Sequence, residues 1–311
     1  MNLAAFALGA LALLLAWPVP ILLGRARWAS RSPAVALILW QAIALAGGLS
    51  MIGALLMFGL APFGDNLVDA SIALFSGFEP RAGTWHLIAL GAALLLAAHL
   101  VLNLVVTVTR SELQRRRHAS LVQLLSSPMA DDPTSRLLDT PAPVAYCLPG
   151  ALSSVTVFSA GLVDLLEEDE LRAVIEHEKA HVAQRHDVVL VVFRAWHTSL
   201  PWFPIAYRAQ REVGLLIEML ADDRARRTVD DAVLARAIAL VGSGGGGADA
   251  TAPGNPAEGS SPHDVRARVL RIATAKPLPT AVEALVVGAS AALIAVPTVL
   301  LLAPAIVALV G

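Results

Sequence analysis

Charged side chains are scarce in this chain of 311 residues: they make up 15% of the sequence, whereas hydrophobic residues make up 56%. Soluble domains typically carry about 25% charged and about 45–50% apolar residues. The single cysteine, Cys147, cannot form an internal disulfide, which excludes a disulfide-stapled secreted scaffold. A formal net charge of −2 provides no basic footprint, so a nucleic-acid partner is excluded as well. The composition indicates a membrane protein.

The apolar residues are concentrated in four runs, each long enough to cross a bilayer as a helix. The first three are residues 3–23, 34–61 and 86–109, and the fourth lies in segment 281–311. The first run has the position of a signal peptide but no basic segment before it, so we interpret it as a retained anchor. We expect three transmembrane helices with short loops in residues 1–109 and a fourth transmembrane helix after the domain that follows.

Arginines predict the orientation of these helices. Arg25, Arg27 and Arg31 follow the first run, and a cluster of four arginines follows the third. By the positive-inside rule both segments lie in the cytoplasm, which puts both termini outside. We therefore expect a multi-pass protein of the cell (inner) membrane, in contact with the lipid bilayer, with residues 110–280 forming a cytoplasmic domain.

This cytoplasmic domain should be of the α+β class, which makes the whole chain a mainly α membrane protein. Helices are expected at 110–126, 162–166, 169–186, 208–228 and 265–275, and extended segments at 141–149 and 153–159. Residues 188–207 are apolar but broken by Pro201 and Pro204, so we expect them to lie against the bilayer surface or to cap the core. Residues 242–261 are rich in glycine and poor in apolar side chains, which predicts a flexible loop.

His177, Glu178 and His181 form a His-Glu-x-x-His motif within the expected helix 169–186. Residues at i and i+4 lie on one face of a helix about one turn apart, so both imidazoles can ligate one metal ion. Glu178 lies one residue round from His177, where its carboxylate can act as a general base on a water at the metal without taking a ligand position. The alternative is a solvated helix with two surface histidines.

Glu218 and Asp222 are the expected partners of the two histidines. They also lie at i and i+4, so both carboxylates share one helix face. Glu218 could complete a His₂Glu site for one Zn²⁺ ion with an open fourth position, and Asp222 could accept the second ring N–H of a ligand, with His177 as the candidate. The alternatives are a pair of solvated acids and a different divalent metal.

For three further polar side chains we expect structural roles rather than roles in catalysis or metal binding. His186 lies five residues past His181, about 140° round a continuous helix, so we expect a surface or packing histidine. His99 and Asn103 share a face within the third apolar run. Hydrogen bonding between helices is the more frequent role of such a pair, and an intramembrane functional site is the alternative.

The ordered combination of features resembles the membrane zinc metallopeptidases of the BlaR/MecR type, the β-lactam-sensor family. That family is related to the CAAX prenyl-protein and HtpX-like proteases and is similar to gluzincins. The resemblance rests on three spans, segment 145–150, strand 153–159, the HExxH motif, Glu218-x-x-x-Asp222 and a closing span. It implies a zincin-like (gluzincin) domain inserted between transmembrane helices three and four. The implied roles are zinc ligands for His177, His181 and Glu218, general base for Glu178, and support of a histidine ligand for Asp222.

The resemblance also implies that an extended protein or peptide substrate pairs with an edge strand of the domain. The residues expected to form this strand are Ser153, Ser154, Val155, Thr156, Val157, Phe158 and Ser159. Sensors of this type carry an extracellular penicillin-binding domain after the last span, whereas this sequence ends at Gly311 and has no Ser-x-x-Lys motif. Covalent sensing of β-lactams is therefore not expected, and a trigger would come from short loops, the spans or a partner.

The favoured function is a membrane-embedded zinc endopeptidase with a cytosol-facing active site, which cleaves a transcriptional repressor or a membrane-proximal segment. A non-catalytic metal-binding signal transducer that binds a partner is the alternative, and it has no need of Glu178. An intramembrane protease is disfavoured, because the helix of the motif carries too many charges for the bilayer centre. The sequence leaves three possibilities open: a sensor or repressor partner protein, a homo-oligomer, and self-cleavage within 242–261.

Overall fold

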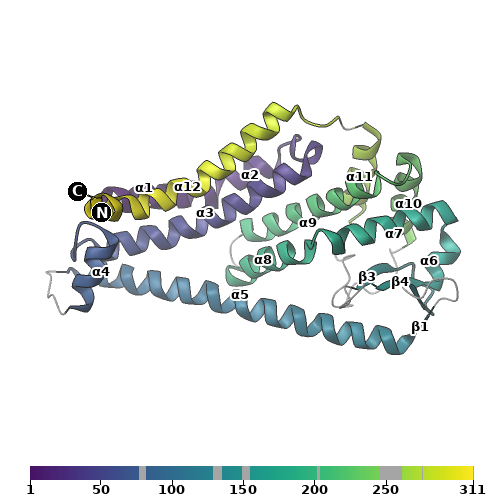
Figure 1. Ribbon diagram of the computed structural model, residues 1–311, viewed down its shortest axis with the longest axis horizontal. Coiled ribbons are helices and arrows are strands. Elements are labelled where there is room, and N and C mark those ends of the chain that lie inside the picture. The colour runs from purple at the N-terminus through teal and green to yellow at the C-terminus, as the bar shows by residue number, and fades with distance from the viewer. Residues whose placement is uncertain are drawn as a thin grey trace.

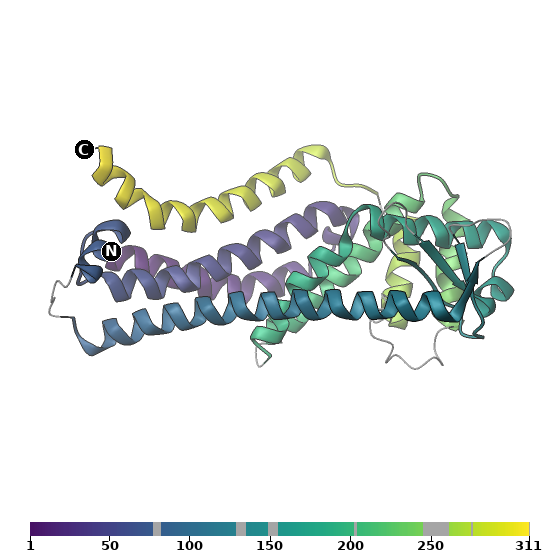
Figure 2. The ribbon, with the colours of Figure 1, turned by 60° about the horizontal axis from the view of Figure 1, so that its bottom comes forward.

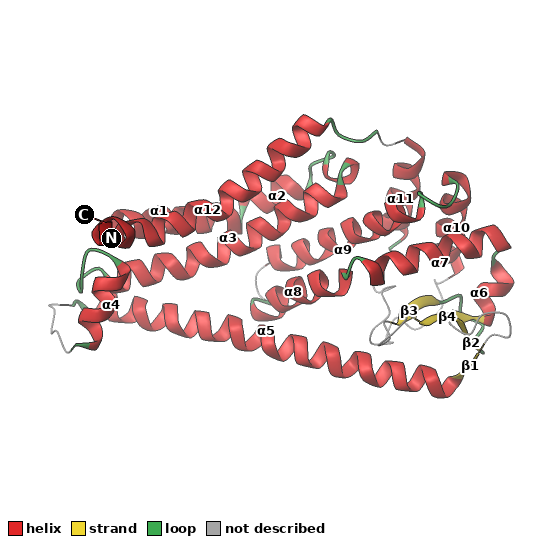
Figure 3. Cartoon of the chain, in the orientation of Figure 1, coloured by secondary structure: helices red, strands yellow, loops and turns green. Residues whose placement is uncertain are grey.

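The computed structural model describes residues 1–76, 82–128, 135–148, 155–201, 204–244, 261–274 and 276–310. These residues are mostly helical and include one small sheet (Figure 3). Long helices form a bundle at one end of the molecule, and the sheet with its covering helices lies at the other end (Figure 1). Both termini lie at the end of the bundle that is far from the sheet (Figures 1 and 2).

Four helical segments of the described chain are long and apolar enough to cross a membrane, at the positions of the four expected runs. The first consists of α1 (Asn2–Ala16) and α2 (Pro18–Gly24), which are separated at Trp17 because Pro18 removes a backbone donor. The other three are α3 (Pro33–Leu60), the first part of α5 (Thr84–Leu125) and α12 (Thr280–Val310). These helices are compatible with a multi-pass membrane protein.

The outer faces of the bundle carry large apolar side chains. Leu95 on α5 is 74% exposed, and Leu285 on α12 is 72% exposed. Soluble monomers rarely expose contiguous apolar surface on this scale. These faces are therefore suited to contact with lipid rather than with water.

The apolar segment after the HExxH motif forms two helices, α8 (His186–Ser199) and α9 (Pro204–Ala225). Both lie between α3 and α5, close to the middle of the molecule (Figure 1). Phe193 of α8 and Ile217 of α9 share a buried core with Trp40 of α3. Of the two expectations for residues 188–207, contact with the core is the one that the structure supports.

Polar side chains of α5 fix α8 in this position. Nε2 of His99 lies 3.2 Å from the carbonyl oxygen of Ser199. The side-chain amide of Asn103 donates to the carbonyl oxygen of Ala195 at 2.7 Å and to the hydroxyl of Ser199 at 2.6 Å. The interpretation of His99 and Asn103 as interhelical hydrogen-bonding residues is confirmed.

The sheet has the strand order β1-β2-β4-β3. β1 (Ser126–Pro128) pairs antiparallel with β2 (Ser135–Leu138), and β2 pairs parallel with β4 (Val155–Ser159). β3 (Ala145–Leu148) pairs antiparallel with the other side of β4. The edges of the described sheet are therefore β1 and β3, and β3 is the edge strand that packs against α7 (Glu168–Ala183).

The expectation that residues 153–159 form the substrate-binding edge is wrong. β4 is paired on both sides, so its backbone groups are already used and cannot accept a substrate strand. Val157 and Phe158 are buried in the core, and the Ser159 hydroxyl accepts the backbone N–H of Leu162 as the N-cap of α6 (Ala160–Leu165). Ser153 and Ser154 lie outside the described residues.

Two of the remaining helices, α10 (Asp231–Gly244) and α11 (Pro262–Thr274), lie beside α7, and the others lie next to α3. α7 begins with a capping box in which Glu167 and Glu170 exchange side-chain and backbone hydrogen bonds. α10 and α11 complete the core behind α7, and residues 245–260 of the expected loop 242–261 lie outside the described residues. A 3₁₀ helix (Ala29–Arg31) precedes α3, and α4 (Leu67–Phe75) follows it, capped by Asn66.

Candidate metal centre

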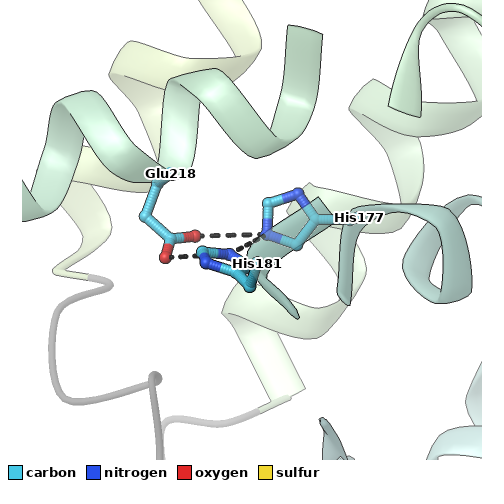
Figure 4. Close-up of side chains that lie close together, drawn as sticks. All are labelled: His177, His181 and Glu218. Carbon is cyan, nitrogen blue, oxygen red and sulfur yellow. Dashed lines mark hydrogen bonds and ion pairs between the residues drawn. The ribbon is translucent and has the colours of Figure 1, made fainter. Parts of the chain in front are cut away.

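Three side chains from two helices bring their donor atoms together (Figure 4). His177 and His181 lie one turn apart on α7, and their Nε2 atoms are 3.2 Å apart. The two carboxylate oxygens of Glu218, on α9, lie 3.3 Å from Nε2 of His177 and 3.5 Å from Nε2 of His181. The structure thus brings together the three side chains that the sequence suggests as ligands.

The donor set fits a zinc ion in chemistry and in spacing. Histidine nitrogens and carboxylate oxygens bind Zn²⁺ at about 2.0–2.2 Å, so neighbouring donors of a tetrahedral site lie about 3.3–3.5 Å apart. The two Nε2 atoms are 3.2 Å apart, and the carboxylate of Glu218 approaches His177 to 3.3 Å through Oε2 and His181 to 3.5 Å through Oε1, so each separation is close to this range although both carboxylate oxygens are involved. Two nitrogens and a carboxylate leave a fourth position open, as in catalytic zinc sites.

Asp222 supports the first histidine from one turn further along α9. Its side chain is fully buried, and its Oδ1 lies 3.0 Å from Nδ1 of His177. Nδ1 of His177 forms no hydrogen bond with the residues that the structure describes, so its contact with Asp222 is a close polar pair. Asp222 occupies the position expected for a carboxylate that fixes the orientation of a metal-binding imidazole.

Arg268 of α11 connects both carboxylates, a role that the sequence does not reveal. Its Nε and Nη2 donate to the two oxygens of Asp222 at 2.9 and 2.7 Å, and its Nη1 lies 3.0 Å from Oε2 of Glu218. The guanidinium is buried and its Nη2 lies 3.5 Å from Nε2 of His177. A single cation therefore holds the carboxylates of Glu218 and Asp222 in place.

His186 is buried and packs against the second histidine, so of the two expectations for it, surface or packing, the packing position is the one that the structure supports. α7 ends at Ala183, Arg185 adopts a left-handed conformation with φ of 51°, and α8 begins at His186. This break returns the ring of His186 to the site, where its Nδ1 lies 3.0 Å from Nδ1 of His181. Its Nε2 lies 2.8 Å from Oε1 of Gln184.

These contacts are consistent with one arrangement of the ring protons of His181 and His186. If His181 offers the lone pair of Nε2 to a metal, its proton is on Nδ1 and is donated to Nδ1 of His186. His186 then carries its own proton on Nε2 and donates it to Gln184. His186 thus plays the same part for His181 as Asp222 plays for His177.

Replacing His186 with leucine is expected to weaken zinc binding about 10–100-fold, the usual effect of removing a group that orients a ligand. Asparagine at this position offers an oxygen acceptor in place of Nδ1, so His186→Asn is expected to retain more affinity than His186→Leu. Competition with a chelating dye measures both values. Equal zinc affinities for wild type and His186→Leu would contradict a positioning role.

Charge in the site favours a bound cation. Burial opposes protonation of His177, but the carboxylates of Asp222 and Glu218 outweigh it and raise the pKa of His177 to about 9. Burial also opposes ionisation of Glu218, yet Arg268 and His177 lower the pKa of Glu218 to about 2. Asp222 is likewise held ionised, because Arg268 and His177 together lower its pKa despite burial. Burial lowers the pKa of His181 to about 3, which keeps that ring neutral.

Glu178 lies beside this cluster on α7. It is partly buried, and removal from water is the main cause that raises the pKa of Glu178 to about 7. In the described part of the chain its carboxylate makes neither a hydrogen bond nor an ion pair. Of the carboxylates near the two histidines it is thus the one left available for chemistry.

Residues 107–214 are similar to peptidase family M48. This M48-like region covers about a third of the chain and includes the second half of α5, the sheet and the HExxH motif. Comparisons with curated proteins and with solved structures each give no match.

The M48-like region supports a metallopeptidase, a hydrolase of peptide bonds, and peptidases of that family are typically zinc-dependent. The similarity ends before Glu218, so it is the structure that adds the carboxylate to the two histidines. Asp222 and Arg268 also lie beyond the M48-like region. The site thus combines two histidines from the region that is similar to family M48 with carboxylates from outside that region.

Proposed function

We propose that this protein is a membrane-embedded, zinc-dependent endopeptidase with a cytosol-facing active site. The observation that carries the proposal is the cluster of donor atoms from His177, His181 and Glu218, with the free carboxylate of Glu178 beside it. The M48-like region supports the same activity, because it contains the HExxH motif.

In this proposal His177, His181 and Glu218 hold the ion. When bound, zinc supplies a Lewis acid that polarises the substrate carbonyl and lowers the pKa of water. Glu178 accepts a proton from the attacking water and passes it to the leaving nitrogen. Asp222 and His186 keep the two imidazoles in the tautomers that present Nε2, and Arg268 keeps the carboxylates of Glu218 and Asp222 in position.

The substrate in this proposal is an extended protein segment that pairs with β3. β3 is an edge strand of the described sheet and packs against α7, which carries the HExxH motif. An extended peptide can add to such an edge through main-chain hydrogen bonds. This strand replaces residues 153–159, whose backbone groups are used within the sheet.

The proposed orientation follows from the arginines at the ends of the apolar helices. Arg25, Arg27 and Arg31 lie between α2 and α3, and a second cluster lies in the second half of α5, on the side of the sheet. The positive-inside rule assigns this side to the cytoplasm. Substrates would then be cytoplasmic regulatory proteins, such as a transcriptional repressor in a BlaR/MecR-type system, or membrane-proximal segments.

Comparing the proteomes of cells that carry wild type or Glu178→Gln tests the function and identifies the substrate. Labelling of new protein N-termini is expected to reveal fragments that are present with wild type and lost with Glu178→Gln. Glu176→Gln, the same change on the same helix at a residue paired with Lys179, serves as the matched control and should retain the fragments. Identical fragments from wild type and Glu178→Gln would contradict proteolysis and favour the non-catalytic transducer.

A further inference from the structure

A basic hollow of about 480 Å³ lies between the α2–α3 connection and α11. It is lined by three basic side chains, Arg31, Arg271 and Lys276, and by the hydroxyl residues Ser30 and Thr274. The other lining residues are apolar, and no acidic side chain of the described chain lines the hollow. Its chemistry therefore favours an anion.

The hollow lies where two apolar helices begin. Arg31 is the last residue of the 3₁₀ helix and comes two residues before α3, and Lys276 comes four residues before α12. Both α3 and α12 are long and apolar enough to cross a membrane. The start of α12 and the α2–α3 connection also lie at the same end of the bundle (Figure 1). The hollow is thus at the level of the lipid headgroups, on the side that the arginines assign to the cytoplasm.

Two of the three cations have no anionic partner in the described chain. Arg31 donates only to backbone carbonyl oxygens. Its Nε donates to the carbonyl oxygen of Lys276 at 2.8 Å, and its Nη2 donates to the carbonyl oxygen of Pro277 at 3.3 Å. Carbonyl groups satisfy its donors without neutralising its charge. The ammonium group of Lys276 is exposed and makes neither a hydrogen bond nor an ion pair with the described residues.

Arg271 gives the hollow a rigid floor. Its side chain is buried, its Nη2 pairs with Asp223 at 2.6 Å, and its Nε donates to the carbonyl oxygen of Ser30. Its Nη1 lies 3.3 Å from the carbonyl oxygen of Met219 on α9. Contacts with α9 and with the α2–α3 connection therefore fix one cation of the hollow in place.

We propose that this hollow binds the phosphate headgroup of an anionic membrane lipid. Basic pockets beside transmembrane helices on the cytoplasmic side are suited to this ligand, because the cytoplasmic leaflet carries the anionic lipids. Free phosphate shares the same chemistry, but the position at the ends of two apolar helices favours a headgroup whose acyl chains remain in the bilayer. The proposal depends on membrane insertion and not on the proposed peptidase activity.

Thermal unfolding of the purified full chain in a neutral detergent tests this site without any substrate. Short-chain phosphatidylglycerol is expected to raise the unfolding midpoint in a saturable way, whereas phosphatidylcholine of the same chain length leaves it unchanged. Lys276→Glu should increase the lipid concentration for half of the shift by about tenfold, and Lys276→Gln should increase it less. Arg227→Glu makes the same change of charge at an exposed residue outside the hollow and should behave as wild type.

Three results would overturn the proposal. Equal shifts with phosphatidylcholine and phosphatidylglycerol would show that charge is not recognised. Equal weakening by Lys276→Glu and Arg227→Glu would show a general charge effect rather than a site. A full shift with inorganic phosphate at the same concentration would assign the hollow to a free anion and remove the lipid headgroup as its ligand.

Discussion

Replacing Glu218 with glutamine is expected to abolish zinc binding and peptidase activity together. The variant keeps the size of the side chain and loses the negative charge that lies 3.3 and 3.5 Å from the two histidine nitrogens. Loss of a direct ligand should weaken zinc binding by more than the about 10–100-fold typical of a supporting residue. Zinc content after dialysis and competition with a chelator measure the change.

Glu212→Gln is the matched control for this experiment. Glu212 lies on the same helix, α9, is partly buried and is outside the cluster of donor atoms formed by His177, His181 and Glu218. It should bind zinc as wild type does, and circular dichroism should show the same helix content for both variants. Wild-type zinc affinity in a folded Glu218→Gln variant would contradict the assignment of Glu218 as the third ligand.

Helical periodicity explains why the sequence can predict the centre of this site. His177 and His181 are separated by one turn of α7, and Glu218 and Asp222 by one turn of α9, so each pair shares a face wherever the helices pack. The apolar helices were predictable for a similar reason, since length and composition suffice to identify them. Packing of α7 against α9, which brings these two pairs together, is a long-range step that the sequence does not contain.

The sequence did not predict the roles of His186 and Arg268, because these roles depend on a helix break and on a tertiary contact. A continuous helix would carry His186 away from His181, but the left-handed conformation of Arg185 ends α7 and turns the chain back. No glycine or proline marks this break. Arg268 lies 46 residues from Asp222, on a separate helix, and only the excess of acids on the face of α9 could have indicated a basic partner.

The sequence does not predict the order of the strands in the sheet either. The alternation of Val155 and Val157 with polar residues predicts a strand, yet it does not distinguish an edge from an interior position. β2, which covers one side of β4, was not expected at all because Ser135–Leu138 is too short to show a period. The strand pattern therefore put the expected edge at β4, which is interior, whereas the neighbouring strand β3 is at the edge of the described sheet.

Replacing Arg268 with methionine is expected to destabilise the fold by about 3–5 kcal/mol, because it leaves the fully buried Asp222 carboxylate without its cationic partner. A buried ion pair differs in this respect from an exposed one, which typically contributes about 0–1 kcal/mol. Arg227→Met removes an exposed arginine and should change stability little. Chemical unfolding monitored by circular dichroism measures both effects.

The double variant Arg268→Met with Asp222→Leu separates stability from positioning. An apolar pair of similar volume often restores the stability lost by breaking a buried ion pair, so the double variant should unfold at higher denaturant concentration than Arg268→Met alone. Its zinc affinity should nevertheless stay about 10–100-fold below wild type, because Nδ1 of His177 has lost the carboxylate that lies 3.0 Å away. If the double variant regains both stability and zinc affinity, Arg268 and Asp222 serve the fold alone and His177 is oriented by other contacts.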